Sequence, residues 1–266
     1  MRAAEPFLAA AAARPDDDLP RLIYADWLDE QGHAARAEFI RLQCAAARGE
    51  PTTSQRAAEL ETTHRDAWLA ELPVTVYHAE FRRGFVEHIV LTARAFLRDG
   101  DLLRRSTPVR SIALLGAAPV LGDLLARRLL NGLKGLHLTD SPLGDEGAVR
   151  LADAACLRNL TTLRLGQTGL SDPGAAALAR SRHLGRLQTL VLRGNAIGDF
   201  GAWELARSAT LAGLTALDVA ANEIGQSGAS ALQSTFVRVD VSGQREMSRW
   251  WRPARQAAKT GPAVLQ

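Results

Sequence analysis

The chain has 266 residues, with 32 Lys and Arg against 29 Asp and Glu, so its formal net charge at pH 7 is only +3. A charge this small excludes an overall basic protein, and nucleic-acid binding would require the arginines to gather on one face. No segment approaches the roughly twenty apolar residues of a membrane span, and the length suits one or two domains.

The first 72 residues have helical periodicity and contain few turn signals. We predict helices at 4–13, 19–31, 34–48 and 54–70. The apolar run at the start is too short for a signal peptide and leads directly into three aspartates. Cys44 and Cys156 lie in Ala-rich stretches without metal-ligand spacing. We therefore expect a cytoplasmic protein with two buried thiols and neither metal nor cofactor.

Two of these helices carry a charge on the face that should be buried. On a helical wheel, the second helix has an apolar stripe of Leu19, Leu22, Ile23 and Trp27. Asp26 falls inside that stripe, and Arg36 and Gln43 fall inside the stripe of the third helix. A lone buried charge is costly, so we predict an Asp26–Arg36 ion pair, with Gln43 completing the hydrogen bonding.

The same cluster could instead bind a small molecule or catalyse a reaction, with Tyr24 and Glu38 beside the pair. Residues 21–43 contain no serine, and His33 falls in a predicted loop. A nucleophile and base cannot be assembled from them. We therefore predict no catalytic residue here.

From Leu133 the chain repeats itself every 27 residues, with new units at Leu160, Leu187 and Leu214. Each unit reads L-x-x-L-x-L, then a turn, then a helix, as in LQTLVLRGNAIGDFGAWELA. The alternating part predicts a short strand. Weaker strand patterns lie at 86–91, 109–114 and 236–241, which gives about seven parallel strands. FRRGF at 81–85 predicts a hairpin against the first of them.

Three units carry an aspartate where a helix N-cap is expected: Asp145, Asp172 and Asp199. The fourth unit has Gln226 at this position, so we predict that its helix starts less firmly.

The repeat resembles the leucine-rich repeat, in the longer helical subclass of ribonuclease inhibitor and the Ran GTPase-activating proteins. Asn195 and Asn222 match the asparagine that bonds the backbone of neighbouring turns in that family, whereas Ser141 and Thr168 replace it. The resemblance implies an α/β solenoid with parallel strands on its concave face and helices on its convex face.

Residues 21–43 also resemble a known family. R-L-x-Y-A-D-W-L-x-E-x-G, followed by R-A-E-F-I-R-L-Q, is similar to the repeat-companion domain, which precedes repeats in large-genome bacteria such as planctomycetes and myxobacteria. A solenoid needs its open ends covered. We therefore expect a helical capping domain at 1–72, the solenoid at 73–243 and a basic tail or cap at 244–266.

Alternate strand positions point into the concave space, and most of them hold small side chains. The exceptions, which we predict to bind a partner, are His137, Arg164, Arg193, Asp218, Arg238 and Asp240. At about 4.8 Å a strand, seven strands span roughly 30 Å, which suits a peptide or one face of a small domain. The alternative is a solvated surface on which these charges pair across strands.

The tail offers a second surface, because residues 245–259 combine basic residues with a tryptophan pair. Its predicted interface residues are Arg249, Trp250, Trp251 and Arg252. They could instead plug the open end of the last repeat.

The chain lacks a Gly-rich phosphate loop, an H-E-x-x-H motif and a Cys–His pair at catalytic spacing. We therefore predict a non-catalytic scaffold that binds a protein or peptide on its concave face. The first alternative is a regulator of a small GTPase, by analogy with the Ran GTPase-activating proteins. Nucleic-acid binding through the basic tail ranks below both.

Overall fold

One eight-stranded sheet runs through the chain, and its strands lie in sequence order. The computed structural model describes residues 4–14, 16–50 and 54–244, so the predicted tail residues Arg249, Trp250, Trp251 and Arg252 lie outside the described residues. The strands are β1 His78–Arg82, β2 Phe85–Thr92, β3 Ser111–Leu115, β4 Gly135–His137, β5 Thr162–Arg164, β6 Thr189–Val191, β7 Ala216–Asp218 and β8 Val239–Asp240. β1 pairs with β2 antiparallel, through a turn inside FRRGF, and the pairs from β2 to β8 are parallel.

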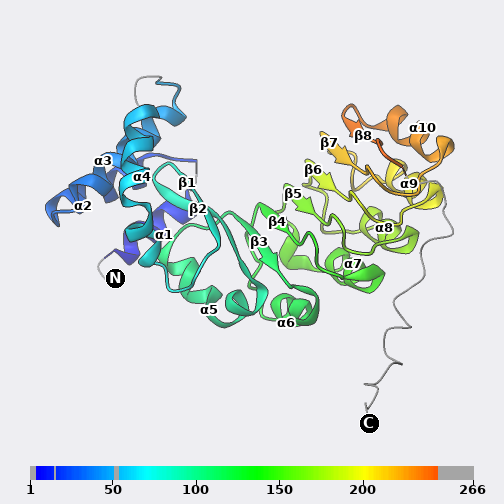
Figure 1. Ribbon diagram of the computed structural model, residues 1–266, viewed down its shortest axis with the longest axis horizontal. Helices are drawn as coiled ribbons and strands as arrows, with labels where there is room; N and C mark the ends of the chain where they lie inside the picture. Colours follow the sequence, from blue (N-terminus) through cyan, green and yellow to red (C-terminus); the bar gives the residue numbers. More distant parts are fainter. Residues whose placement is uncertain (1–3, 15, 51–53, 245–266) are drawn as a thin grey trace, which may run out of the picture.

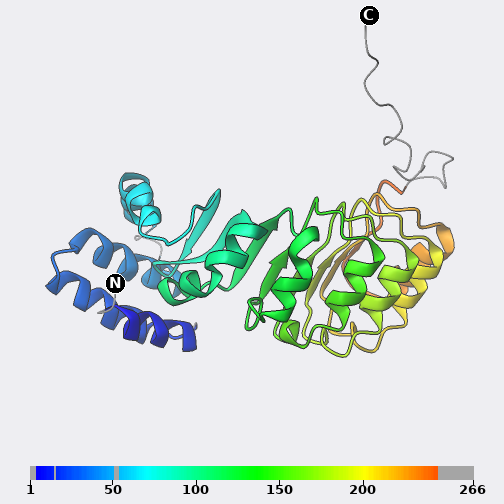
Figure 2. The same cartoon turned by 90° about the horizontal axis from the view of Figure 1, so that it is seen from below.

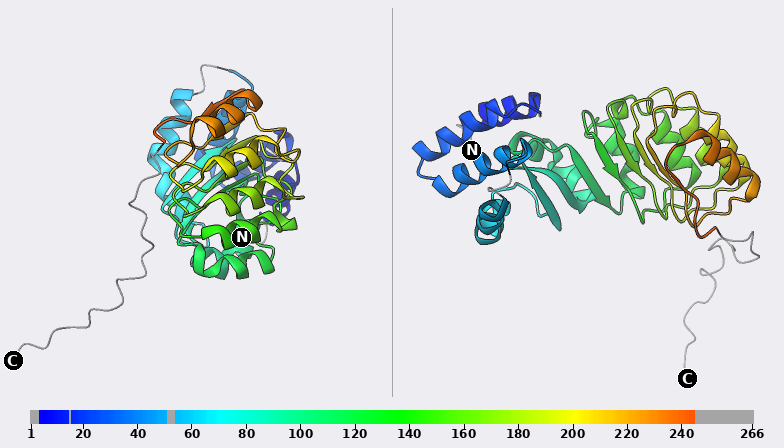
Figure 3. Two further views of the ribbon diagram at one scale, coloured as in Figure 1. Left: turned by 90° about the vertical axis from the view of Figure 1, so that its right-hand side faces the viewer. Right: turned by 90° about the horizontal axis from the view of Figure 1, so that it is seen from above.

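Helices connect the parallel strands and cover one side of the sheet. They are α5 Ala93–Ser106, α6 Leu121–Ala126, α7 Gly144–Ala152, α8 Asp172–Ala179, α9 Asp199–Ala206 and α10 Gln226–Thr235, with short 3-10 turns at Ala118–Val120 and Ala155–Leu157. The body is curved, with β2–β8 on its inner side and these helices on its outer side (Figure 1). From below, the helices lie side by side across the outer face (Figure 2). From the C-terminal end they stack one above another (Figure 3, left).

The core is a column of leucines contributed by successive units. Leu136, Leu163, Leu190 and Leu217 occupy the middle of four consecutive strands, pair with one another in register, and are almost wholly buried. Burying such a side chain is worth about 1.5–3 kcal/mol, but each leucine gains this only because the neighbouring units cover it. Stacking and folding are therefore a single event for these units.

Asparagine side chains join the turns of neighbouring units. Nδ2 of Asn195 donates to the carbonyls of Leu165 and Leu192, and its Oδ1 accepts from the amides of Thr168 and Leu170. Asn222 bonds the next turn in the same way. Gln244 extends the series past the last unit, which the sequence had not indicated. Ser141 accepts one such bond, from the amide of Ala117, so fewer side-chain hydrogen bonds join the turns there.

The predicted aspartate caps act on a different helix from the one expected. Oδ1 of Asp172 accepts from the amides of Gly198 and Gly201, 2.7 and 2.9 Å away, at the start of α9. Asp145 likewise serves the start of α8, and Asp199 that of α10. The prediction that each aspartate caps its own helix is therefore wrong, as is the weak start predicted at Gln226.

The glycines at the third position of these helices follow from the same bonds. A Cβ on Gly174, Gly201 or Gly228 would lie 2.4–2.7 Å from the carboxylate oxygen that accepts its amide. The aspartate of one unit and the glycine of the next, both within the D-x-G motif of the units, therefore encode a bond between neighbouring units.

Four helices precede the sheet: α1 Glu5–Ala13, α2 Leu19–Glu30, α3 Ala34–Ala47 and α4 Ser54–Ala70. They lie at the opposite end of the body from α10 (Figure 3, right). A small second core joins α1, α2 and α3 to Phe85 at the start of β2. Cys44 is buried in this core and Cys156 in the larger one, both as free thiols. Burial raises the pKa of the Cys44 thiol to about 12.

The predicted Asp26–Arg36 ion pair does not form. The Asp26 side chain is 71% exposed and bonds Arg41 at 2.7 Å. The face of α2 that packs inward is Arg21, Ala25 and Leu28. The predicted apolar stripe is therefore only partly right: Leu22 and Trp27 pack against the second core, whereas Leu19 and Ile23 are 57% and 47% exposed.

Arg36 is half-buried, and aromatic rings surround its guanidinium in place of the predicted carboxylate. Its guanidinium carbon lies 4.5 Å from the ring centre of Trp68, 4.9 Å from that of Phe81 and 5.5 Å from that of Phe39. Burial lowers the pKa of Arg36 to about 10, and its Nη1 has no hydrogen-bond partner among the described residues. The ring faces supply the attraction that a carboxylate would otherwise provide.

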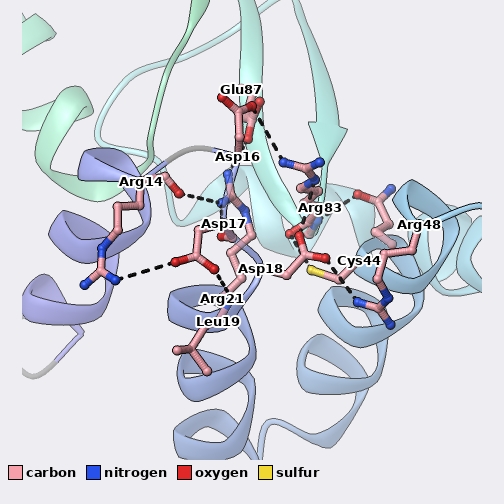
Figure 4. A network of polar contacts seen from close by, with 12 residues as sticks. Arg14, Asp16, Asp17, Asp18, Leu19, Arg21, Cys44, Arg48, Arg83 and Glu87 are labelled. Atoms are coloured by element: carbon pink, nitrogen blue, oxygen red, sulfur yellow. Dashed lines mark hydrogen bonds and ion pairs between the residues drawn. The ribbon is translucent and has the colours of Figure 1, made fainter.

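The buried ion pair of this region joins Arg21 to Glu87 on β2. Nη2 of Arg21 lies 2.6 Å from Oε1 of Glu87, and the two side chains are 0% and 6% exposed. Nη1 of Arg21 also donates to the carbonyl of Asp17. Burial raises the pKa of Glu87, and the Arg21 bond offsets only part of that rise. Figure 4 shows this pair at the centre of a polar network between the helices and the β1–β2 hairpin.

The hairpin also docks directly onto α3. The amide of Gly84 donates to Oε1 of Gln43 at 2.8 Å, so Gln43 bonds the hairpin and not the predicted pair. Gly84 has a φ of +83°, and a Cβ there would lie 2.4 Å from Ile40. Only glycine fits this turn, which fixes the helical unit against the first strands.

We expect Arg21→Met to lower the free energy of unfolding by about 3–5 kcal/mol, because it leaves the Glu87 carboxylate buried without its partner. The double variant Arg21→Met/Glu87→Gln should recover part of this loss. Urea unfolding measures both. The control is Asp26→Ala, which removes an exposed pair and should cost less than about 1 kcal/mol. Equal losses in Arg21→Met and Asp26→Ala would contradict the assignment.

We expect Asp172→Ala to cost about 1–2 kcal/mol, as does the loss of a helix cap. Hydrogen exchange should quicken at the amides of Gly198 and Gly201, in the following unit, and not at the start of α8. The exposed Asp153, replaced by Ala, is the control and should leave both amides protected. Faster exchange confined to α8 would restore the original cap assignment.

Candidate functional site

The inner face of the sheet carries one continuous row of side chains. The strand register aligns Val90, Ala113, His137, Arg164, Val191, Asp218 and Asp240. This is the central row that the repeat spacing predicts. The large polar members of the row divide into two groups separated by Val191.

The first group borders a hollow of about 450 Å³ over β1–β5. Its lining residues are Glu80, Arg82, Glu87, His88, Arg110, Ser111, Lys134, Gly135, His137, Thr161, Thr162 and Arg164. The floor is low where Ser111, Gly135 and Thr162 lie side by side on β3, β4 and β5. Gly135 has no alternative, since a Cβ there would lie 2.3 Å from Oγ of Ser111.

Two histidines meet above this floor. The ring centres of His88 on β2 and His137 on β4 are 5.2 Å apart, across the short side chains of β3. Burial, followed by the nearby Arg164 charge, lowers the pKa of His137 to about 4. Burial also lowers the pKa of His88. Both rings are therefore neutral at pH 7.

Cationic side chains predominate around the hollow, and they differ in whether a carboxylate pairs with them. Arg110 is held by Asp16 at 3.0 Å and lies 3.9 Å from Glu87. Arg82 has only a long contact with Glu80, at 4.0 Å. Lys134 and the exposed Arg164 make no side-chain hydrogen bond or ion pair within the described ranges.

The second group lies over β6–β8 beside a shallower hollow of about 350 Å³. Here the charges balance in number, and Arg193 lies 4.0 Å from Asp240, a contact as long as that of Arg82 with Glu80. Asp218 and Asp240 accept from the backbone amides two residues further on, at 3.0 and 2.9 Å. The bonds from Ser242 lower the pKa of Asp240. Arg238 is exposed at the edge of this hollow.

The structure thus separates the predicted residues: His137 and Arg164 border the first hollow, whereas Arg193, Asp218, Arg238 and Asp240 surround the second. Sequence reasoning missed Lys134, Arg110 and Glu80. Lys134 and Arg110 hold the second position of the L-x-x-L-x-L pattern, just before their strands, and so fall outside the alternate positions that the pattern predicts to face inward. Glu80 lies on the antiparallel β1, whose register the repeat does not set.

No group of three or more His, Cys, Asp or Glu side chains within residues 4–14, 16–50 and 54–244 could hold a metal ion. In the same part of the chain, no helix has both the length and the apolar character needed to cross a membrane.

Comparison with known proteins identifies the repeated part. The family model described as "Leucine Rich repeat" matches residues 133–152, 156–179 and 214–232. This part of the chain is a leucine-rich-repeat domain. Among solved structures, the chain is similar to an internalin from Listeria monocytogenes, with 16% identity and a TM-score of 0.26 over 52% of this chain. The match spans about half of that protein, 49% of its length. No curated protein matches the chain.

We expect His137→Gln to reduce the loss of stability between about pH 6.5 and about pH 4. The pKa of His137 falls from 6.5 in the unfolded chain to about 4 in the leucine-rich-repeat domain. The unfolded chain therefore binds more protons in this window, and stability decreases as the pH falls through it. Urea midpoints at pH 7 and pH 5 measure the effect. His33→Gln, at an exposed histidine, should keep the wild-type pH dependence, and identical curves for all three proteins would contradict the assignment.

Proposed function

We propose that the protein is a non-catalytic scaffold that binds another protein or a peptide on the inner face of its leucine-rich-repeat domain. The observation that carries this proposal is the inner face itself. It is hollowed, its floor is made of small residues, and it holds cationic side chains, Lys134 and Arg164, that bond nothing among the described residues. Side chains with a purely structural role in this fold, such as Asn195, make several bonds each.

The helical unit and the solenoid of such a scaffold would have different roles. We propose that residues 1–72 form a repeat-companion unit that caps the solenoid, which extends over 73–243. The Arg21–Glu87 pair and the Gly84–Gln43 bond support this interpretation, because both join the helical unit to the first strands. The ribonuclease-inhibitor-like subclass, a bacterial source and a cytoplasmic location belong to the same proposal.

Regulation of a small GTPase is a second candidate, favoured by one observation. Arg164 and Arg193 are exposed on the inner face, where an arginine could reach a nucleotide held by a partner. Stimulated GTP hydrolysis in the presence of a bacterial GTPase, lost in Arg164→Ala or Arg193→Ala, would favour this candidate over simple binding. Nucleic-acid binding through residues 244–266 would instead fall steeply with salt and disappear when these residues are deleted.

We expect a partner captured by the wild-type protein from native lysate to be lost with the double variant Arg164→Glu/Asp218→Arg. The two changes reverse charges in both groups of the inner face without altering the net charge. Affinity capture with mass spectrometry measures the loss.

The control exchanges two exposed charges away from the inner face, Arg158→Glu/Asp153→Arg, and should capture the same partner as the wild type. Equal capture by all three folded proteins would place the binding surface elsewhere.

A further inference from the structure

We propose that the hollow over β1–β5 binds an acidic segment, rich in Asp and Glu, of a partner protein. This inference rests on the proposed scaffold function and specifies the chemistry of its partner. It concerns the end of the inner face nearer the helical unit, whereas most of the residues predicted from the sequence lie at the other end.

The first argument is the balance of charge at the hollow. Four cationic side chains border it: Arg82, Arg110, Lys134 and Arg164. Of its two carboxylates, Glu87 is buried and bound to Arg21, so it offers nothing outward. Glu80 alone faces the hollow as an accessible acid, 4.0 Å from Arg82. Asp16 neutralises Arg110, but Arg82, Lys134 and Arg164 still outnumber Glu80, so the accessible surface is positive.

The second argument is that two of these cations have no partner. Lys134 and Arg164 approach the hollow from the start of β4 and the end of β5, and neither makes an ion pair among the described residues. Arg193, by contrast, has Asp240 within 4.0 Å on the same face. Acidic side chains brought by a ligand could form charge-assisted contacts with both cations.

The neutral histidine pair helps the same ligand. His88 and His137 lie 5.2 Å apart, and each neutral imidazole can donate one N–H hydrogen bond to a carboxylate. The hydroxyls of Ser111 and Thr162 on the floor can donate as well. The hollow therefore offers neutral donors beside its cations.

The shape favours a chain over a small anion. Five strands at about 4.8 Å spacing span roughly 19 Å, the length of about six extended residues. The hollow shares Arg82, Glu87 and Arg110 with a second cleft of about 520 Å³ between the hairpin and helices α3 and α4. A linear ligand can continue from one into the other, whereas a single phosphate would fill only a fraction of this volume.

Binding of fluorescein-labelled hexaglutamate to the full-length protein tests the inference by fluorescence anisotropy. Hexaglutamine and hexalysine of the same design are the control peptides. We expect binding of hexaglutamate alone, weaker at about 300 mM than at about 50 mM NaCl because salt screens the exposed charges. Binding of hexaglutamine with equal affinity would overturn the inference.

The site is tested with two charge-matched variants. Lys134→Gln/Arg164→Gln removes the two unpartnered cations and should weaken hexaglutamate binding about tenfold. Arg193→Gln/Arg238→Gln removes the same charge from the other end of the inner face and should leave binding within about twofold of wild type. Circular dichroism confirms that both fold. Equal weakening of hexaglutamate binding in both variants would overturn the inference. Unchanged binding in both variants would also overturn it, and this is the result expected if residues 245–259 bind the peptide.

Competition with other anions distinguishes an acidic peptide from a phosphate or nucleic-acid ligand. Inorganic phosphate should displace hexaglutamate only at concentrations where sodium chloride of equal ionic strength does so, because general screening is then its only effect. Specific displacement by phosphate, or tighter binding of a single-stranded RNA hexamer that the Lys134→Gln/Arg164→Gln variant loses, would overturn the acidic peptide.

The two proposals can fail separately. If hexaglutamate does not bind but a lysate partner is still lost with Arg164→Glu/Asp218→Arg, the acidic segment is wrong and the scaffold function stands. If hexaglutamate binds as expected but no lysate partner depends on the inner face, the hollow binds acidic peptides and the proposed scaffold function is not supported.

Discussion

The units from Leu160 onward leave backbone groups that side chains of the neighbouring units bond. The amide of Gly201 at the start of α9 depends on Asp172 of the preceding unit, and the carbonyl of Leu165 depends on Asn195 of the following one. An unbonded amide or carbonyl in these turns would cost the free energy of a lost hydrogen bond. The leucine column has the same dependence, because each Leu is covered only when units stack. The stacking of the units in parallel register follows from these bonds between neighbours.

At the N-terminal end no preceding repeat covers the first parallel strand, and other contacts complete it. β2 has no preceding parallel strand, and the antiparallel β1 occupies its free edge. Glu87 points away from solvent toward the helices, where Arg21 neutralises it. Replacing such a pair with apolar residues is often neutral for stability, so its value here lies in fixing how the helical unit meets the sheet. Arg36 shows a second solution, a cation held among aromatic faces.

This arrangement has a consequence for the inner face. Arg110 is tied to Asp16 of the helical unit, so one of the cations at the hollow is positioned by the residues before the sheet. The helical unit therefore shapes the end of the surface that we propose to bind an acidic segment. At the other end, Arg193, Asp218 and Asp240 form local bonds, and their charges are less available to a partner. The inner face is thus asymmetric in charge: near α10 two aspartates balance Arg193 and Arg238, whereas near the hairpin the cations outnumber the accessible carboxylates.

The sequence by itself determined the repeat, its 27-residue period, the positions of the strands and the row of side chains that faces inward. These follow from local periodicity, which reports the direction of a side chain from a strand. It could not determine which carboxylate meets which guanidinium: the wheel placed Asp26 inside, yet the packed face of α2 is the one that carries Arg21. It assigned Asp145, Asp172 and Asp199 to the wrong helices, because spacing along the chain does not distinguish a cap within a unit from one between units. Lys134, Arg110 and Glu80 became part of a site only when β1, β3, β4 and β5 were laid side by side. Tertiary structure decided these points because charge pairing and hollows depend on distances between segments remote in the chain, and a one-dimensional pattern does not contain those distances.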